Sequence, residues 1–192
     1  MSFDVFVGVF LVMALGERFF EHRFSQRAER GDRKMAWSFA ALQIFYVAVF
    51  VATAVEYYGW PRPIHLWVTG LGLGLTVVAL VVRLTAIRTL GKFWSLDLEI
   101  RPQHQLMTEG IYRHVRHPAY SSIMLEMVAV PLVANAYGTL LLAVGIYVPL
   151  LLWRWRVEEM EMIKKFGDRY VQYRREVPAF VPGLGGRGKL RD

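Results

Sequence analysis

The chain has 192 residues, of which 55% are hydrophobic and 14% aromatic, with 23 lysines and arginines, a formal net charge of +7 and no cysteine. This length predicts one domain, and the lack of cysteine excludes disulfides, thiolate metal sites and cysteine nucleophiles, so we predict no metal centre. An apolar composition with many basic residues favours a membrane protein with basic flanks over a soluble globule. A nucleic-acid-binding protein is excluded because apolar segments separate the basic residues into distinct groups.

The first apolar run, Val5–Gly16, is the weakest of five candidates for a membrane span. It holds 12 uncharged residues between Asp4 and Glu17, whereas a span needs about 20 residues. Snorkelling of Arg18 toward the membrane surface would lengthen it. The N-terminus lacks a basic stretch and a small-residue cleavage site, so we predict a retained helix and not a signal peptide.

The second and third runs, Trp37–Val55 and Ile64–Val82, each have 19 residues and match the length of a span. Aromatic residues such as Trp60 lie between them, as is typical of a membrane surface. Within the third run, Gly70 and Gly74 have the spacing that allows two helices to approach closely. The sequence leaves open whether the partner helix belongs to the same molecule or to a second copy.

The fourth and fifth runs are Ala119–Ala134 and Tyr137–Trp153. The connection at Asn135 is so short that we expect the two helices to form a tight antiparallel hairpin. Glu126 lies about two helical turns inside the fourth run, where a carboxylate is costly and is a functional candidate by default. The alternatives for Glu126 are a hydrogen-bonded structural carboxyl group or a protonated one.

The basic residues are sorted by these spans. With five spans, 22 of the 23 lysines and arginines fall in residues 17–36, 83–118 and 154–192. The positive-inside rule places these segments in the cytoplasm and the N-terminus outside. A four-span model without the first run leaves the segments on the same sides, so it stays possible. We predict a multi-pass protein of the inner or plasma membrane with its active site on the cytoplasmic face.

The C-terminal part begins with a predicted helix, Arg154–Gly167, that leaves the membrane and carries Glu158 on the same face as Arg154. Its two adjacent glutamates have a plain alternative as a solvated face, and Arg116-His117 has one as a basic anchor. Val177–Pro182 is an extended apolar segment that lies along the bilayer or folds back as a lid. We predict that the Gly-rich tail after it is disordered.

Several motifs between residues 83 and 182 resemble those of the isoprenylcysteine carboxyl methyltransferase family and related integral membrane methyltransferases. In chain order they are His104-Gln105-Leu106-Met107, Gly110-Ile111-Tyr112, Arg116-His117-Pro118-Ala119-Tyr120, Arg154 with Glu158-Glu159, Phe166-Gly167 with Tyr170 and Tyr173, and Val177-Pro178 with Val181-Pro182. The family usually has Gly two residues after the motif tyrosine, where this chain has Ser122.

The resemblance implies an all-α, polytopic membrane helix bundle of about five transmembrane helices, with S-adenosylmethionine bound at the cytosolic face by a C-terminal helix and a connecting loop. We expect one domain over residues 1–192, divided into N-terminal membrane helices (1–82), a cofactor-binding catalytic core (83–182) and a tail (183–192). The implied cofactor contacts, with Arg116 and Glu159 added, are His104, Gln105, Leu106, Met107, Tyr112, Arg116, His117, Pro118, Ala119, Tyr120, Glu158 and Glu159. The implied residue near the substrate is Arg154, and Glu126 is the second catalytic candidate.

The residues fit methyl transfer to a lipophilic acceptor, most simply the carboxylate of a lipidated molecule or an enol or phenol. In-line displacement needs mainly proximity and alignment, and a carboxylate needs no general base because it is already ionised. Arg154 would bind an acceptor carboxylate, and backbone N–H groups around Arg116–Ala119 would hold the cofactor's carboxylate. The alternatives are a phospholipid amine N-methyltransferase, a sterol reductase-like enzyme that uses a nicotinamide cofactor, and a non-catalytic membrane scaffold. The sequence does not fix the oligomeric state.

Overall fold

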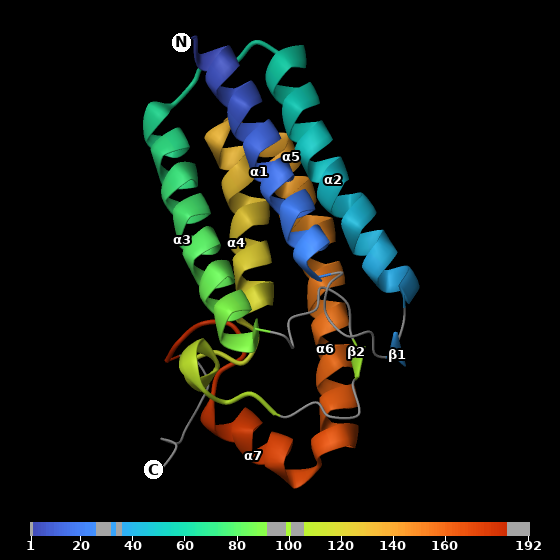
Figure 1. Cartoon of the computed structure of the whole chain (residues 1–192). Coiled ribbons are helices and arrows are strands. Elements are labelled where there is room, and N and C mark those ends of the chain that lie inside the picture. Colours follow the sequence, from blue (N-terminus) through green and yellow to red (C-terminus); the bar gives the residue numbers. More distant parts are fainter. Residues whose placement is uncertain (1, 26–31, 34–35, 92–98, 101–105, 184–192) are drawn as a thin grey trace.

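The protein is a bundle of long helices that end in a smaller helical cap (Figure 1). The computed structural model describes residues 2–25, 32–33, 36–91, 99–100 and 106–183. The elements, in order, are α1 (Phe3–Ser25), β1 (Asp32–Arg33), α2 (Ala36–Gly59), α3 (Leu66–Leu90), β2 (Glu99–Ile100), the 3-10 helix η2 (Gly110–Arg113), α4 (Pro118–Val133), α5 (Tyr137–Leu142), the π-helical turn η3 (Ala143–Tyr147), α6 (Val148–Phe166) and α7 (Asp168–Glu176). The predicted all-α fold is confirmed, with one two-residue antiparallel ladder between β1 and β2.

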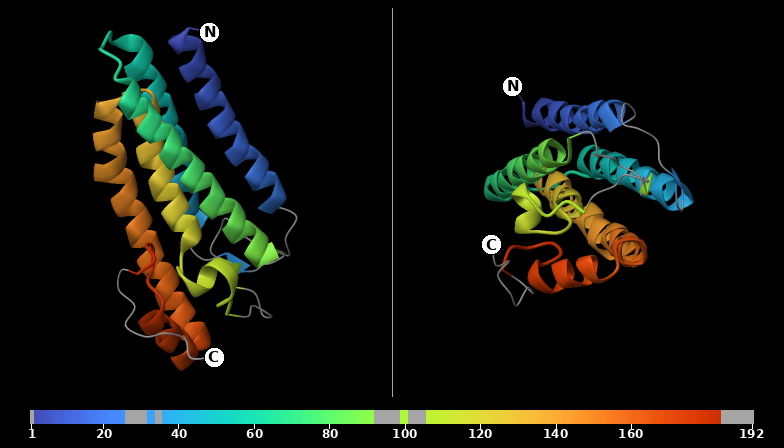
Figure 2. Two further views of the ribbon diagram at one scale, coloured as in Figure 1. Left: turned by 90° about the vertical axis from the view of Figure 1, so that its left-hand side faces the viewer. Right: turned by 60° about the horizontal axis from the view of Figure 1, so that its bottom comes forward.

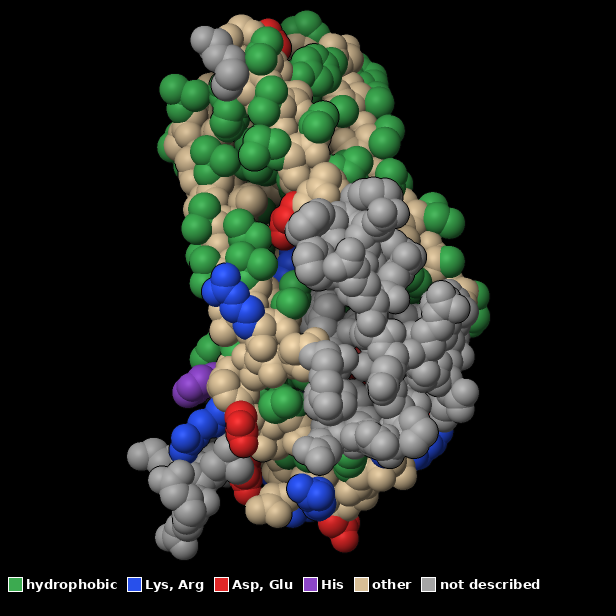
Figure 3. All heavy atoms as spheres, in the orientation of Figure 1, with side chains coloured by type: hydrophobic (Ala, Val, Ile, Leu, Met, Phe, Trp, Pro, Cys, Tyr) green, Lys and Arg blue, Asp and Glu red, His purple; other side chains and the backbone are tan. Residues whose placement is uncertain are grey.

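Three helices of the described chain are long and apolar enough to cross a membrane: Trp37–Gly59, Leu66–Leu90 and Tyr137–Phe166. The last of these combines α5, η3 and α6. The apolar helix Pro118–Val133 is shorter, and α1 runs beside the others without meeting the same criterion. Hydrophobic side chains cover most of the visible surface of the long helices, whereas charged ones gather at the α7 end (Figure 3). These features are those of a multi-pass membrane protein.

The bundle is centred on α4, and one glycine of α3 sets the closest approach to it. A Cβ atom at Gly72 would lie 2.7 Å from the backbone nitrogen of Val133, so only glycine fits there. Gly70 and Gly74 are exposed, and a Cβ atom added at either position would meet nothing within 4 Å. Of the two alternatives left open for Gly70 and Gly74, packing within the molecule is not what the structure shows, because the spacing did not indicate which face of α3 meets α4; contact with a second copy stays untested.

The predicted hairpin at Asn135 is confirmed. Asn135 adopts a positive φ of 54°, a conformation that Asn tolerates better than most residues. Its side chain accepts a hydrogen bond from the His65 backbone at 3.0 Å and donates one to Thr69 at 2.9 Å. This turn therefore ties the start of α3 to the α4–α5 connection.

At the opposite end of the bundle, the chain after α7 folds back onto the start of α4. The Arg116 and His117 N–H groups donate to the carbonyl groups of Pro178 and Ala179, each at 2.9 Å. Of the two arrangements expected for Val177–Pro182, the folded-back one is confirmed. The predicted disordered tail lies outside the described residues from 184 onward. The predicted division into core and N-terminal helices stays a prediction, and α3 continues through residues 82 and 83 as one helix.

Candidate functional site at the α7 end

Two basic and two acidic side chains meet where α4 begins and α6 leaves the bundle. They are Arg116, His117, Glu158 and Glu159, which we call the α7-end cluster. Pro118 occupies the first turn of α4, where its missing N–H costs nothing, so it fixes the start of the helix directly after this basic pair. In Figure 2, α7 lies on one side of the bundle and α1 on the opposite side.

Glu159 is the buried carboxylate of the cluster. One of its oxygens lies 2.9 Å from Arg116 Nη2 and 3.1 Å from His117 Nε2, and it also accepts from the Tyr170 hydroxyl at 3.3 Å. Its second oxygen is 3.4 Å from Arg174 Nε. Glu159 therefore joins the start of α4, α6 and α7. The prediction that it also contacts the cofactor stays untested.

Glu158 is the accessible carboxylate of the cluster, with 24% of its side chain exposed. It accepts a hydrogen bond from the Tyr120 hydroxyl at 2.6 Å, and its other oxygen lies 3.7 Å from His117 Nδ1. The His117 ring thus lies between the two glutamates. Arg154, one turn before Glu158, is only 5% exposed and donates to Ser38 of α2 at 2.6 Å. Arg154 is also hydrogen-bonded to Tyr120.

Arg116 is buried but only partly satisfied. Its Nη2 atom pairs with Glu159, whereas Nε and Nη1 are buried without a hydrogen-bond partner in the described part of the chain. Unpartnered buried donors are rare in folded proteins because each costs about 1–3 kcal/mol. Two nitrogens of one guanidinium, Nε and Nη1, are therefore left for an anionic group of a ligand.

The backbone amides do not have the role predicted from the sequence. The N–H groups of Arg116 and His117 were expected to hold the cofactor's carboxylate, but they donate to the C-terminal segment. Pro118 has no N–H at all. For Arg116 and His117 the prediction is wrong, because the sequence does not reveal that residues 178–179 pair with the start of α4. For the N–H group of Ala119, which it also covered, it stays a prediction. The Arg116 side chain, and not these amides, offers free donors.

The remaining predicted cofactor contacts cluster in two places. Met107 and Ala119 pack with the buried residues Tyr112 and Ala86, whereas Leu106 packs against Tyr170 and Tyr173 of α7. His104 and Gln105 lie outside the described residues. The Tyr173 hydroxyl donates to the Tyr112 carbonyl at 2.5 Å. Burial raises the pKa of both Tyr112 and Tyr173, so their hydroxyl groups stay protonated.

Ser122 occupies the position where the family usually has glycine. It is fully buried, and its hydroxyl donates to the Ala119 carbonyl at 2.7 Å. The extra polar atom is thereby satisfied within α4.

The second catalytic candidate, Glu126, lies in a different group of residues. It is 3% exposed, accepts from Tyr46 at 2.6 Å, lies 3.2 Å from Arg18 and pairs with Arg83. We call Arg18, Tyr46, Arg83 and Glu126 the interior cluster. Of the readings left open by the sequence, the structure shows a hydrogen-bonded and ion-paired carboxylate; a catalytic role stays a prediction. The sequence interpretation missed Arg83, which it treated as a basic flank, and Ser38, for which it offered no signal.

The fold and the site define a polytopic membrane protein with a polar, partly unsatisfied site at one end of its bundle. The family model described as "Isoprenylcysteine carboxyl methyltransferase (ICMT) family" matches residues 72–164. Protein-S-isoprenylcysteine O-methyltransferase B of Arabidopsis thaliana is 30% identical over 152 residues, which are 75% of this chain and 73% of that protein. The corresponding enzyme of Schizosaccharomyces pombe is 31% identical over 118 residues, 57% of this chain and 48% of that one.

A solved structure agrees with these relatives. The structure of the eukaryotic intramembrane Ras methyltransferase ICMT matches with a TM-score of 0.57 and 25% identity, over 76% of this chain and 53% of that one. This chain thus spans about half of that protein. The chain belongs to the isoprenylcysteine carboxyl methyltransferase family and is a membrane methyltransferase.

Proposed function

We propose that this protein transfers a methyl group from S-adenosylmethionine to the carboxylate of a prenylated cysteine at the cytoplasmic face of its membrane. The observation that carries the proposal is the Arg116 guanidinium, which is only partly satisfied among the described residues, together with the accessible Glu158 on the other side of His117. The acceptor class follows from the relatives, which are named protein-S-isoprenylcysteine O-methyltransferases. The cytoplasmic location of the site is supported by the distribution of charge, because 22 of the 23 lysines and arginines lie on one side of the predicted spans.

The side chains of the α7-end cluster fit the charged parts of this cofactor. The free N–H groups of Arg116 match its carboxylate, and Glu158 matches its ammonium group or its ribose hydroxyls. Met107, Tyr112 and Ala119 form an apolar surface nearby for its less polar part. When bound, S-adenosylmethionine supplies an electrophilic methyl group on a sulfonium.

Arg154 fits the acceptor. It is held on two sides, by Ser38 of α2 and Tyr120 of α4, so its position is fixed before a substrate binds. A guanidinium in this place orients an acceptor carboxylate by charge and by hydrogen bonds. Because the carboxylate is already ionised at neutral pH, the chain needs no general base.

The test is a pair of measurements on the protein in lipid nanodiscs. Calorimetry with S-adenosylhomocysteine measures cofactor binding, and labelled S-adenosylmethionine with an S-farnesylcysteine measures turnover. We expect Glu158→Gln to weaken cofactor binding roughly tenfold, because a hydrogen bond to a charged group is lost. Arg154→Gln should leave cofactor binding intact and cut turnover by a similar factor.

Two controls sharpen this test. Arg156→Gln changes an exposed arginine of the same helix and should change neither quantity. The carboxamide of the same S-farnesylcysteine should not be methylated. Failure of S-adenosylhomocysteine to bind the parent protein would overturn the proposal, and equal turnover on the carboxamide would overturn the acceptor assignment.

A further inference from the structure

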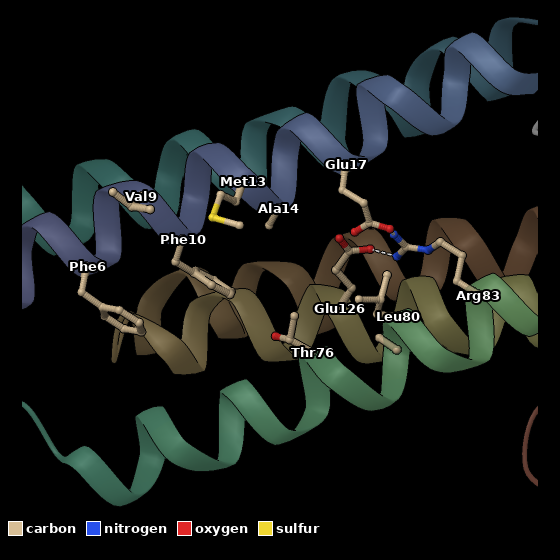
Figure 4. A pocket seen from close by; sticks show the side chains of 11 residues that line it. Phe6, Val9, Phe10, Met13, Ala14, Glu17, Thr76, Leu80, Arg83 and Glu126 are labelled. Atoms are coloured by element: carbon tan, nitrogen blue, oxygen red, sulfur yellow. Dashed lines mark hydrogen bonds and ion pairs between the residues drawn. The ribbon is translucent and has the colours of Figure 1, made fainter.

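A cavity of about 380 Å³ lies between α1 and α3 and reaches α4 at Glu126 (Figure 4). The side chains that face each other across it are Phe6, Phe10, Met13 and Ala14 of α1 and Thr76 and Leu80 of α3. An apolar cavity of about 150 Å³ already accommodates benzene, and ligand pockets begin at about 300 Å³. The cavity is therefore large enough for part of a hydrocarbon chain.

The cavity opens on the apolar outer surface of the bundle. Two of its lining residues, Val9 and Met13, are 46% and 69% exposed. Both are among the large hydrophobic side chains that the long helices expose, and such side chains cover much of the visible surface of the bundle (Figure 3). A lipid chain can enter sideways from the membrane, and walls without polar groups do not hold water well.

The inner end of the cavity is polar, and its hydrogen bonding is incomplete. Arg83 is 1% exposed, pairs with Glu17 at 3.0 Å and with Glu126, and has an Nε atom without a partner in the described part of the chain. Glu21 lies next to it, with Oε2 at 3.9 Å from this Nε. The other oxygen of Glu21 is also buried and unpartnered within the described residues. The Nε donor of Arg83 and one oxygen of the neighbouring Glu21 are thus both buried without a partner among the described residues.

The charges at this end select the head group of the occupant. An anionic head would meet the carboxylates of Glu17 and Glu126, and a cationic head would meet the guanidinium group of Arg83, which all line the cavity. A hydroxyl group has one donor and two acceptor sites, so it satisfies both unpartnered atoms without adding charge. We propose that this cavity binds a long-chain lipid alcohol from the bilayer, with its hydroxyl at Arg83 and Glu21. The site is separate from the α7-end cluster.

The first experiment locates the bound chain. The protein in nanodiscs is irradiated with hexadecanol that carries a diazirine at mid-chain, and the labelled peptides are mapped by mass spectrometry. We expect labels within residues 6–17 and 76–83. Unlabelled hexadecanol should compete roughly tenfold better than hexadecanoate or hexadecyltrimethylammonium, because only the alcohol pairs both buried atoms without charge repulsion. Labels confined to other helices, or equal competition by the three amphiphiles, would overturn the proposal.

The second experiment fills the cavity. Ala14→Leu and Thr76→Leu add bulk from opposite walls and should each reduce labelling roughly tenfold, whereas Ala40→Leu, on an exposed position of α2, should not. Unfolding in SDS, which should be as cooperative in all three variants as in the parent, verifies that they are folded and does not depend on the proposed methyl transfer. Undiminished labelling in both filled variants would contradict the lipid site.

Discussion

Two buried ionic clusters of the described residues differ in how accessible their carboxylates are. In the interior cluster, Glu126 is surrounded by partners from three other helices, Arg18 of α1, Tyr46 of α2 and Arg83 of α3. In the α7-end cluster, Glu159 is similarly surrounded, but Arg116 keeps free donors and Glu158 is accessible. A buried charge in a membrane protein is therefore not by itself a catalytic mark. Each cluster holds a buried arginine with an unpartnered nitrogen among the described residues, so the exposure of Glu158 is what distinguishes them.

The largest expected effect comes from Arg83→Met. Removing one member of a buried ionic group leaves the remaining charges without compensation, which typically costs about 3–5 kcal/mol. Glu126 and Glu17 both lose a partner in this variant. Unfolding from mixed micelles with increasing SDS measures the loss in the free energy of unfolding. Arg88→Met, at an exposed position of the same helix, should stay within about 0.5 kcal/mol of the parent.

The outcome for Arg83 decides whether the interior cluster is a structural element. If Arg83→Met is as stable as the parent, the interior cluster does not hold the helices together. The proposed difference in role between it and the α7-end cluster would then be wrong. Glu126→Gln in the same background removes the uncompensated carboxylate, so it should recover part of the lost stability.

A smaller effect is expected from Glu159→Gln. This variant tests whether the buried Glu159 and the accessible Glu158 of the α7-end cluster have different roles. The neutral amide keeps the size of the side chain but loses the ion pair with Arg116. A hydrogen bond between charged groups contributes about 1.5–3 kcal/mol, so SDS unfolding should show a loss of that size. Cofactor binding should weaken together with stability, because α4, α6 and α7 are joined at this residue.

Glu158→Gln is the matched comparison for that variant, since it makes the same chemical change at the neighbouring residue. It should weaken cofactor binding while the free energy of unfolding changes by no more than about 0.5 kcal/mol. Equal losses of stability in the two variants would show that the accessible and the buried glutamate do not have different roles.

The sequence predicted what depends on local pattern. The length of the apolar runs predicted the long helices, and the short link at Asn135 predicted the hairpin. The α7-end cluster was predicted because its members lie within motifs of recognisable spacing. The interior cluster was not, because the partners of Glu126 lie 43, 80 and 108 residues away in the chain. Only the packing of four helices brings these side chains together.

The same limit explains two places where the structure departs from what the sequence suggested. Gly70 and Gly74 have a packing motif's spacing, yet Gly72 between them faces α4, because helix rotation is set by neighbours and not by the motif. The amides of Arg116 and His117 begin a helix and so were assigned to an anion. They are taken by residues 178 and 179, more than sixty positions later in the chain, and no local pattern announces that pairing.

The smallest expected effect comes from Tyr120→Phe. The Tyr120 hydroxyl donates to Glu158 at 2.6 Å and is also hydrogen-bonded to Arg154, so it orients one candidate cofactor contact and one candidate acceptor contact. Losing a hydrogen bond of this kind costs about 1 kcal/mol, which is roughly fivefold in an equilibrium constant. We expect calorimetry to show that decrease in affinity for S-adenosylhomocysteine, with unchanged unfolding in SDS. Tyr137→Phe, which removes a hydroxyl bonded to Asn135 at the far end of the bundle, is the control and should bind as the parent does. If Tyr120→Phe instead lowers stability and leaves affinity unchanged, Tyr120 supports the fold as Glu159 does, and Glu158 and Arg116 remain the candidate cofactor contacts.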